Sequence, residues 1–531
     1  MKIIVAEKMS ASAVDLLREP EWTVLTPEQM NGDLARYLET ADALIVRSAV
    51  QVNAELLAKA PRLRVIGRAG VGVDNIELEP ATRQGIAVMN TPGANAVAVA
   101  EHTIALMLAM ARHLCRANDL THAGMWEKKS LQGTELRGKA LGIVGLGRVG
   151  MEVARRARAF GMTIIGHDPF VSTTVAKEQG IRLTALDDVY AAADYLTLHV
   201  GLTAQTAGMI NAESLKKMKR GVRLVNCARG ELIDERALAE ALTEGQLAAA
   251  ALDVFAEEPL KDSPLAALSN VILTPHIGGS TYEAQEAVGY QIALQVKEYL
   301  KHGVIQNAVN VPSVSHDEYL ELQPYISLAE KLGAFLAQIS EGTLEEISLR
   351  YSGHIAEQKT ELIRNAAIKG MLNQALEEKA NLVNAATIAE SRGLQVHESH
   401  KPKGSTGGAG SVLSIMVRTN SEEHIIKGAV LHQNAARLLH VDGIEVEAPL
   451  ERNLIYLRNR DVPGVIGKVG TILGDRKINI ADFSLGRRAH DDVAAREAIA
   501  VVHVDGTVPE AILAELRKIP AVEKAKAVRL F

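Results

Sequence analysis

The first 97 residues alternate short, continuously apolar runs with amphipathic segments. The apolar runs occupy residues 3–5, 43–46, 65–67 and 87–88. The segments between them, such as 11–17 and 54–59, show the apolar spacing of a helix. A strand that is apolar at every position is typical of a parallel sheet covered by helices on both faces. The pattern therefore predicts that residues 1–97 form a βαβ domain of their own.

The same alternation resumes at residue 139 and continues to about residue 280. Further strands are predicted at residues 141–144, 163–166, 195–199, 223–226, 249–254 and 271–273. Asp234 has the side chain of an N-cap for a helix that ends near Gly245. Such a succession of strand–helix units predicts a doubly wound parallel sheet of the Rossmann type in residues 98–280. A helix from about 281 to 302 is expected to return to the first domain, which would comprise residues 1–97 and 281–312.

Residues 101–112 are predicted to form a helix with little polar surface. A helix that is apolar nearly all round is buried in a core or in an interface. Because this helix lies at the junction of two domains, it could form a subunit contact or an interdomain core.

The pattern changes after residue 312. Alternating strands are predicted at 346–351, 412–417 and 444–447, and helices at 360–376 and 384–391. Residues 454–531 read as strand, helix, strand, strand, helix, strand, the βαββαβ order of ferredoxin-like folds. Such a sheet would have an open edge at which two copies could pair. We therefore expect an α/β protein with a flavodoxin-like first domain, a Rossmann-type second domain, an α+β domain at 313–452 and a ferredoxin-like domain at 453–531.

A glycine-rich turn, GLGRVG at residues 145–150, separates a predicted strand from a helical run at residues 151–160. Glycines in this context allow the backbone to approach a pyrophosphate, and the helix N-terminus offers free N–H groups to it. Asp168 ends the next strand, about 20 residues later, where a ribose hydroxyl partner is expected. The alternative is an ordinary strand–turn–helix whose glycines only allow close packing. The context on both sides favours a dinucleotide site.

The length of the chain indicates how many domains it has, and its net charge indicates which kinds of partner it can bind. A chain of 531 residues is too long for one core and predicts three or four domains. The net charge of −6 makes nucleic acid an unexpected partner, and an anionic substrate would need a local basic site. Two cysteines in the whole chain suit a reducing cytoplasm, where we expect the protein. No signal peptide, membrane span or metal site is expected.

Three polar residues follow consecutive predicted strands of the second domain. They are Arg229, Glu258 and His276. Ligands of open α/β sheets bind at the carboxyl ends of the strands. An arginine can hold a substrate carboxylate by two hydrogen bonds, a histidine can take a hydroxyl proton, and a carboxylate can orient the histidine. Each residue alone could be a surface or loop residue, but together they predict hydride transfer on a 2-hydroxy acid.

Several sequence blocks resemble the D-isomer-specific 2-hydroxyacid dehydrogenases. In the second domain these blocks are GLGRVG…HDP, VNCARGELID, ALDVFAEEP and LTPHIGGST. The first-domain blocks, VRSAVQV, GRAGVGVDNIE and NTPGANAVAVAEH, are most similar to the D-3-phosphoglycerate dehydrogenase group of that family. Residues 460–487 resemble an ACT domain, which senses amino acids, and residues 313–452 resemble the intervening allosteric domain of the long form.

The resemblance assigns roles to individual residues. Arg229 would anchor the substrate carboxylate, His276 would be the acid/base, and Glu258 its partner. The residues implied to bind NAD are Gly145, Gly147, Arg148, Val149, Gly150, Asp168, Val200, Cys227, Ala228, Arg229, Asp253, His276, Ile277, Gly278 and Gly279. The residues implied to bind substrate are Arg47, at the phosphate, and Gly70, Val71, Gly72, Val73 and Asn95. Asp461 and Asn479 match positions that bind serine across a dimer interface.

Three residues depart from the family pattern. Val71 stands where threonine is common, and Val200 interrupts the usual His-Thr-Pro-Leu block, so that a side-chain hydroxyl contact is lost. Asn459 stands where a relative has tyrosine, close to the expected serine site.

The resemblance implies a cytoplasmic, NAD-dependent enzyme that oxidises 3-phospho-D-glycerate to 3-phosphohydroxypyruvate at the start of serine synthesis. A homo-oligomer, either a dimer or a tetramer, and regulation by L-serine are expected. One alternative is a glyoxylate or hydroxypyruvate reductase, although those enzymes usually lack the C-terminal domains. The other is a non-catalytic, NAD-sensing protein of the corepressor type.

Overall fold

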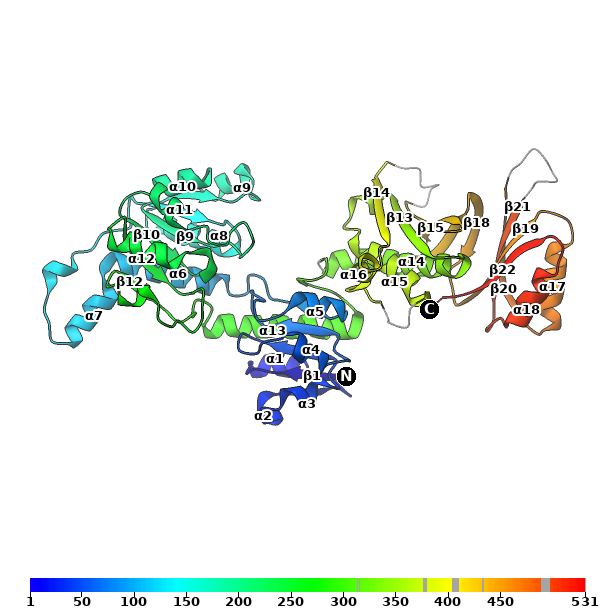
Figure 1. Ribbon diagram of the computed structural model, residues 1–531, viewed down its shortest axis with the longest axis horizontal. Coiled ribbons are helices and arrows are strands. Elements are labelled where there is room, and N and C mark those ends of the chain that lie inside the picture. Colours follow the sequence, from blue (N-terminus) through cyan, green and yellow to red (C-terminus); the bar gives the residue numbers. More distant parts are fainter. Residues whose placement is uncertain are drawn as a thin grey trace.

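The computed structural model describes residues 1–312, 314, 316–375, 380–403, 410–431, 434–488 and 497–530. The described residues contain four sheets in an elongated molecule, with the second sheet at one end, the first sheet next to it, and then the third and the fourth (Figure 1). The first two sheets are entirely parallel, and the last two contain antiparallel pairs.

The first sheet has the strand order β2-β1-β3-β4-β5. Its strands are β1 (Lys2–Val5), β2 (Thr23–Leu25), β3 (Ala43–Val46), β4 (Val65–Arg68) and β5 (Ala87–Met89). Its helices are α1 (Ala11–Leu16), α2 (Pro27–Met30), α3 (Leu34–Leu38), α4 (Ala54–Ala58) and α5 (Leu78–Arg83). The long helix α13 (Tyr282–His302) returns from the second sheet and packs against α1 and β4.

The second sheet has seven strands in the order β12-β11-β10-β9-β6-β7-β8. These are β6 (Ala140–Val144), β7 (Thr163–His167), β8 (Ile181–Leu183), β9 (Tyr195–Leu198), β10 (Val222–Asn226), β11 (Leu247–Leu252) and β12 (Val271–Leu273). The α-helices of this part are α6 (Ala96–Arg112), α7 (Leu114–His122), α8 (Arg148–Ala159), α9 (Thr173–Glu178), α10 (Leu186–Ala192), α11 (Ala212–Lys217) and α12 (Glu235–Thr243). Three 3₁₀ helices complete it: η1 (Lys128–Leu131), η2 (Gly230–Leu232) and η3 (Pro264–Ala267). Asp234 caps α12 as predicted, since its carboxylate accepts hydrogen bonds from two backbone amides of the first turn.

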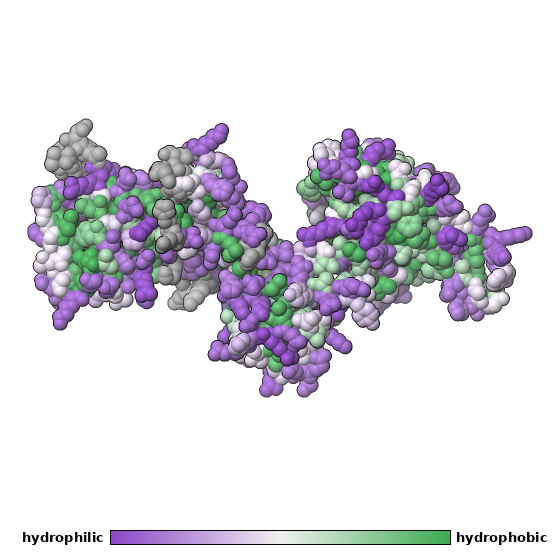
Figure 2. All heavy atoms as spheres, turned by 180° about the vertical axis from the view of Figure 1, so that it is seen from behind, coloured by the Kyte–Doolittle hydropathy of each residue, from purple (hydrophilic) through white to green (hydrophobic). Residues whose placement is uncertain are grey.

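Helix α6 belongs to the core of the second sheet. It packs against α8, β10 and β11, and ten of its residues are buried. This packing accounts for the apolar character of residues 101–112. The next helix, α7, has no buried residue and projects from the end of the molecule (Figures 1 and 2). Trp126, in the segment after α7, is exposed. Helix α7 was not predicted from the sequence.

No single helix among the described residues is both long and apolar enough to cross a membrane. Helices α6 and α7, which form a bent pair, reach that length and apolar composition only when they are taken together.

The third sheet has the order β14-β13-β15-β16-β17-β18. Its strands are β13 (Leu344–Gly353), β14 (Gln395–Lys401), β15 (Ser411–Thr419), β16 (Glu423–Leu431), β17 (Ala435–Val441) and β18 (Ile444–Pro449). Its helices are α14 (His316–Ile339), η4 (His354–Glu357), α15 (Glu361–Ala375) and α16 (Ala385–Ser391). Of these elements, α14, β14, β16 and β17 were not predicted from the sequence. Helix α14 was missed because it contains Pro324, and a proline ordinarily marks a helix boundary.

The fourth sheet has the βαββαβ arrangement, with the order β20-β21-β19-β22. Its elements are β19 (Asn453–Arg460), α17 (Val465–Asp475), β20 (Ile480–Arg487), β21 (Glu497–Val504), α18 (Glu510–Arg517) and β22 (Val522–Arg529). Ile455 and Leu457 pack with its own helices, whereas Leu454 and Tyr456 join the core of the third sheet and α14. Both faces of this sheet are therefore buried within one chain.

Among the described residues, strand β20 forms ladder hydrogen bonds with β21 alone, so it is an edge strand of the fourth sheet, in keeping with the expected open edge. Strand β18 lies alongside it without forming ladder hydrogen bonds, and the backbone at Gly486 comes so near Glu445 that an added Cβ would collide with the carbonyl oxygen. Only residues 450–452 separate β18 from β19. This short connection keeps the third and fourth sheets together.

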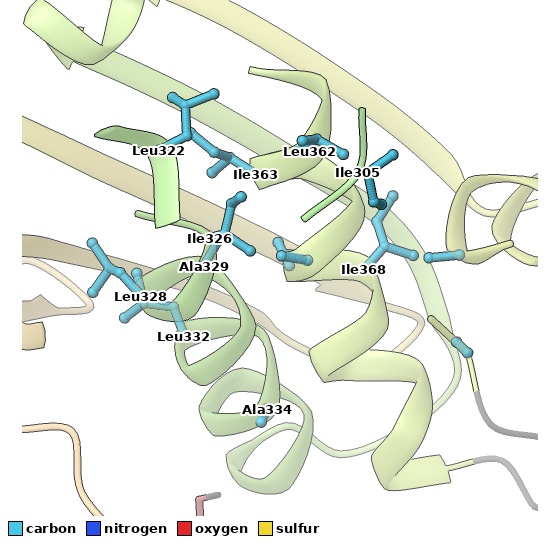
Figure 3. Packing of buried hydrophobic residues seen from close by; sticks show 14 of the residues in the cluster. Ile305, Leu322, Ile326, Leu328, Ala329, Leu332, Ala334, Leu362, Ile363 and Ile368 are labelled. Carbon is cyan, nitrogen blue, oxygen red and sulfur yellow. The ribbon is translucent and has the colours of Figure 1, made fainter. Parts of the chain in front are cut away.

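Helices α14 and α15 cross at very short range, and their apolar side chains interlock (Figure 3). A Cβ atom added at Gly333 would collide with the backbone of Ala367, and one added at Gly370 would collide with the backbone of Glu330. The two glycines therefore set the distance between the helices.

Replacement of Gly333 by alanine should separate α14 from α15. We expect the free energy of unfolding to fall by about 1–3 kcal/mol, the usual cost of overpacking a well-packed core. Gly470→Ala in α17 is the matched control, because nothing lies within 4 Å of the added Cβ. That control should raise stability by about 0.4–1 kcal/mol by restricting the unfolded chain. Urea unfolding of both variants measures the effect, and a Gly333→Ala protein as stable as the parent would contradict the packing argument.

Candidate active site

A cavity of about 870 Å³ lies between the first and second sheets. Its walls are loops that follow strands of both sheets: Arg47 follows β3, Arg229 follows β10 and His276 follows β12. Because parallel strands end at the same edge of a sheet, residues far apart in sequence meet at this cleft. The predicted catalytic residues Arg229, Glu258 and His276 all line it.

Glu258 and His276 form a direct pair. The Glu258 Oε2 atom is 2.7 Å from His276 Nδ1, and the Phe255 amide donates a hydrogen bond to Glu258 Oε1. A carboxylate on Nδ1 places the proton of the neutral ring there, so that Nε2 is the free base. The geometry matches the predicted division of roles, in which Glu258 orients the histidine.

The loop that carries His276 is held by the buried carboxylate of Asp253. This carboxylate accepts hydrogen bonds from the Ile277 amide at 2.9 Å, the Gly278 amide at 2.7 Å and the Thr274 hydroxyl at 2.6 Å. Asp253 was predicted as a cofactor residue, and here its carboxylate also shapes the loop beside the cofactor site.

Arg229 reaches across the cleft to the first domain. Its Nε atom donates to Asp74 Oδ2 at 3.0 Å, and its Nη1 atom donates to the carbonyl oxygen of Ala228 at 2.6 Å. Its guanidinium lies so close to the backbone of Gly72 that a side chain at this position would collide with it. The guanidinium is thus already oriented by a carboxylate in the cleft.

Two further arginines give the cleft a positive charge. The Arg47 guanidinium donates to the Lys8 carbonyl oxygen at 3.3 Å and to the Gln285 side chain. Arg68, at the end of β4, also lines the cleft, and its buried Nε atom has no hydrogen-bond partner. Burial, and then the nearby Arg229, lowers the pKa of Arg68. Arg68 was not predicted as a site residue, since it follows directly on the apolar run of residues 65–67, although it belongs to the GRAG block.

The remaining predicted substrate residues surround these arginines. Gly70 and Asn95 line the cleft. Asn95 precedes α6, and its side chain forms no capping bond to the helix, so its amide remains available to a ligand. Val71, Gly72 and Val73 form the loop after β4, and Val71 is partly exposed.

The glycine-rich turn joins β6 to α8. Gly145 has a φ of +94°, and a Cβ atom at Gly150 would collide with the Gly145 carbonyl, so both positions require glycine. Gly147 is the N-cap of α8, and the space around it is open. The helix therefore begins at Arg148, three residues before the predicted residue 151, because it starts inside the motif.

Asp168 lies directly beside this turn. Its carboxylate accepts hydrogen bonds from the amides of Leu146 and Phe170, both at 2.8 Å. Arg148 in the motif donates to the carbonyl oxygen of Pro92 in the segment that leads into α6. These contacts create a backbone cradle bordered by one acidic side chain, which suits a dinucleotide with free ribose hydroxyls.

The other predicted cofactor residues lie between the turn and His276. Val200 packs behind Gly145, and Cys227 and Ala228 follow β10. Burial raises the pKa of Cys227 to about 12, so this thiol is not a nucleophile. Gly279 lies against Asn95, at the point where the second sheet meets the first domain.

The predicted effector residues lie in the fourth sheet. Asp461 pairs with Arg487 at 3.6 Å, and Asn479 donates to Asp505 Oδ2 at 2.8 Å. The β-ladders place Asp461 level with the start of β21 and Asn479 level with its end. Strand β21 has eight residues, so its two ends are roughly 23 Å apart. One small ligand can therefore touch both residues only if they come from two chains.

Three families of domains match the chain. The NAD-binding domain of D-isomer specific 2-hydroxyacid dehydrogenases matches residues 104–278, the D-3-phosphoglycerate dehydrogenase intervening domain matches residues 321–442, and the ACT domain matches residues 454–521. These matches confirm the resemblance drawn from the sequence blocks, the expected fold class and NAD as the cofactor.

Relatives match over the full length. The D-3-phosphoglycerate dehydrogenase of Methanocaldococcus jannaschii is 42% identical over 100% of both chains. The enzyme of the same name from Bacillus subtilis is 37% identical over 100% of this chain and 99% of its own.

Solved structures resemble the first two sheets. The TT0316 protein from Thermus thermophilus is 36% identical with a TM-score of 0.53, over 58% of this chain and 100% of that one. The D-lactate dehydrogenase of Aquifex aeolicus, complexed with NAD and lactic acid, is 30% identical with a TM-score of 0.52, over 59% of this chain and 100% of its own. Taken together with the full-length relatives, these findings show that the chain belongs to the D-3-phosphoglycerate dehydrogenases, within the family of D-isomer specific 2-hydroxyacid dehydrogenases.

Proposed function

We propose that this protein oxidises 3-phospho-D-glycerate to 3-phosphohydroxypyruvate with NAD, the first step of L-serine synthesis. The observation that carries the proposal is the cleft, in which three arginines surround a paired histidine and glutamate. Arg47, Arg68 and Arg229 concentrate positive charge in a chain whose net charge is −6. A substrate with a carboxylate at one end and a phosphate at the other fits this charge distribution.

The residues of the cleft divide the chemistry among them. Arg229 binds the substrate carboxylate, exchanging its bond to Asp74 for one to the substrate. His276 Nε2 accepts the proton of the 2-hydroxyl group, and Glu258 stabilises the imidazolium that results. NAD held at the glycine-rich turn of residues 145–150 would supply the acceptor for the hydride on C2.

The proposed cofactor contacts begin at the glycine cradle. The backbone at Gly147 and the N-terminus of α8 receive the pyrophosphate. Asp168 accepts hydrogen bonds from the adenosine ribose, and its charge repels the 2′-phosphate of NADP. Cys227, Ala228, Asp253 and residues 276–279 lie on the nicotinamide side.

Arg47 and Arg68 are the proposed phosphate ligands. Both side chains come from the first sheet, opposite the catalytic pair. The unpartnered Nε atom of Arg68 leaves it a donor for an anion. The backbone of residues 70–73 and the Asn95 amide line the rest of the substrate site.

The proposal assigns a task to each part of the chain. Residues 1–97 and 281–312 bind substrate, residues 98–280 bind NAD, and residues 313–452 and 453–531 regulate the enzyme. The setting is the cytoplasm, and the enzyme is a homo-oligomer, a dimer or a tetramer. The exposed apolar side chains of the α7 projection, including Leu114 and Trp126, support a subunit contact there.

Regulation by L-serine is the second part of the proposal. The ligand would contact Asp461 of one chain and Asn479 of another, because the two residues lie at opposite ends of one sheet. Strand β18 lies beside β20, so pairing of two β20 edges would displace the fourth sheet from the third. Serine would bind more tightly to the displaced arrangement than to the packed one. Allosteric regulation requires such a difference in affinity between two states.

The first prediction separates the proposed enzyme from its alternatives. Wild-type protein should reduce phosphohydroxypyruvate with NADH faster than it reduces glyoxylate or unphosphorylated hydroxypyruvate. His276→Ala should lower kcat by about 10²–10⁴-fold, because the proton donor is lost, with little change in NADH affinity. His122→Ala, at the exposed end of α7, is the control. No turnover of any 2-oxo acid by wild type would leave the NAD-sensing alternative, and normal kcat in His276→Ala would remove the histidine from the mechanism.

The second prediction concerns the phosphate. Arg47→Ala and Arg68→Ala should each raise KM for phosphohydroxypyruvate by roughly 10- to 100-fold, the effect of losing a charged hydrogen bond. The KM for unphosphorylated hydroxypyruvate should change much less. Arg83→Ala, an exposed arginine on α5, should change neither value. Equal effects of the two cleft variants on both substrates would rule out a phosphate-specific contact.

The third prediction concerns serine. L-Serine should inhibit the wild-type protein, and Asn479→Ala should abolish the inhibition while leaving kcat without serine nearly unchanged. A coupling free energy of about 1–3 kcal/mol would shift the substrate curve by a readily measured factor. Asp475→Ala, an exposed residue at the end of α17, should respond like wild type. Failure of wild type to bind or respond to millimolar serine would end this part of the proposal and direct attention to Asn459.

A further inference from the structure

A histidine outside the proposed chemistry contacts the network beneath the His276 loop. His102 lies in the second turn of α6, the helix that follows the crossing from the first domain. Its Nε2 atom is 3.2 Å from Thr274 Oγ1 and 3.3 Å from Asp253 Oδ1.

The Asp253 carboxylate, with which His102 makes contact, holds the whole loop. Asp253 is only 1% exposed, and its oxygens accept hydrogen bonds from Thr274, Ile277 and Gly278. Its backbone carbonyl accepts a further hydrogen bond from the His276 amide at 2.8 Å. The segment before, at and after the catalytic histidine is therefore tied to one residue.

The conformation of His276 makes this attachment necessary. Its φ angle is +52°, in the left-handed region that residues with a side chain rarely adopt. Such a conformation persists only when the surrounding structure holds it in place. The hydrogen bonds to Asp253 provide this constraint, and they set the position from which His276 Nδ1 reaches Glu258.

The hydrogen-bond geometry assigns the hydrogen on His102. The Thr274 hydroxyl donates its hydrogen to Asp253 Oδ1, so only its lone pairs can face His102. Asp253 Oδ1 is an acceptor as well. His102 Nε2 must therefore carry a hydrogen, which it shares between Thr274 and Asp253.

The charge state of Asp253 depends on the same contacts. Burial alone would raise the pKa of this carboxyl, but hydrogen bonds from His102, from Thr274 and from two backbone amides hold it below its usual value. An ionised Asp253 is the form that can accept all of these hydrogen bonds.

We propose that His102 is a positioning residue, which acts through Asp253 and Thr274 to hold the loop that carries His276. This inference rests on the proposed function, because His276 must be the acid/base for its position to affect turnover. Loss of the His102 donor loosens the attachment of residues 274–278 and moves His276 relative to the substrate. Small misplacements of a reacting group can cost a large factor in rate.

Two variants of similar size test the proposal. His102→Gln places an amide nitrogen near the position of Nε2, whereas the shorter His102→Asn cannot reach Thr274 or Asp253. His102→Asn should lower kcat with phosphohydroxypyruvate by about 10- to 100-fold with little change in KM, and His102→Gln should retain most of the activity. His102→Leu should behave like His102→Asn. This comparison shows whether the loss of activity comes from the missing hydrogen-bond donor or from the change in side-chain polarity.

Two readouts distinguish positioning from a general loss of structure. The primary deuterium isotope effect on kcat, with NADH labelled at the transferred hydrogen, should rise in His102→Asn as hydride transfer becomes slower than the other steps. Hydrogen exchange at the Ile277 and Gly278 amides should be faster in His102→Asn than in wild type or His102→Gln. The second readout requires no turnover, so it tests the attachment even if the proposed substrate is wrong.

Thr274→Val provides an independent route to the same network. It should lower kcat in the same direction, and its effect combined with His102→Asn should be less than additive in free energy, because both changes loosen one attachment. Equal activity of His102→Asn and wild type, equal loss in the Asn and Gln variants, or unchanged exchange at residues 277 and 278 would each overturn the proposal. Absence of turnover by wild type would instead overturn the proposed function alone.

Discussion

The buried carboxylate of Asp253 is the constraint on which the geometry of the cleft depends. A carboxylate is costly to remove from water unless hydrogen bonds compensate for the lost hydration. Here the compensating donors are the groups that define the loop of residues 274–278. The hydrogen bonds that compensate for the buried charge of Asp253 thus also hold His276 in a conformation that it would not adopt alone. The short contact between His276 and Glu258 follows from that arrangement.

The cleft also contains like charges that repel one another and a carboxylate that reduces this repulsion. Three arginines lie close together, and burial of Arg68 makes its charge harder to maintain. Asp74 offsets part of this repulsion through its bond to Arg229. An anionic ligand can replace Asp74 as the partner of Arg229, since a carboxylate or phosphate offers the same acceptor oxygens. The free cleft is therefore suited to anions before any ligand enters.

The third and fourth sheets share one hydrophobic core, and this limits how they can regulate the enzyme. Leu454 and Tyr456 of β19 are buried with residues of α14 and the third sheet. Asn381, in the segment before α16, donates a hydrogen bond to the Gly85 carbonyl oxygen of the first domain at 2.8 Å. Movement of the fourth sheet would disturb the third, and the third is bonded to the domain that carries Arg47 and Arg68. Packed and hydrogen-bonded residues therefore connect the fourth sheet to the first domain.

The sequence by itself determined the local features of this protein. Continuous apolar runs marked the parallel strands, the GLGRVG block marked the turn before α8, and strand ends located Arg229, Glu258 and His276. These features follow from neighbouring residues and from one rule, that parallel strands deliver their carboxyl ends to the same edge. The sequence blocks along the chain resembled those of one family, and the full-length relatives then confirmed that family.

Only the tertiary structure decided what depends on residues far apart in the chain. The orientation of Arg229 depends on Asp74, 155 residues away, and the inward position of Arg68 depends on the packing of β4. Helix α14 forms despite Pro324 because its apolar side chains are buried against α15 and the third sheet. The contact between β18 and β20, which joins the third and fourth sheets, also depends on packing between separate elements. Long-range packing overrides local preference at such positions, and no pattern of neighbouring residues carries that information.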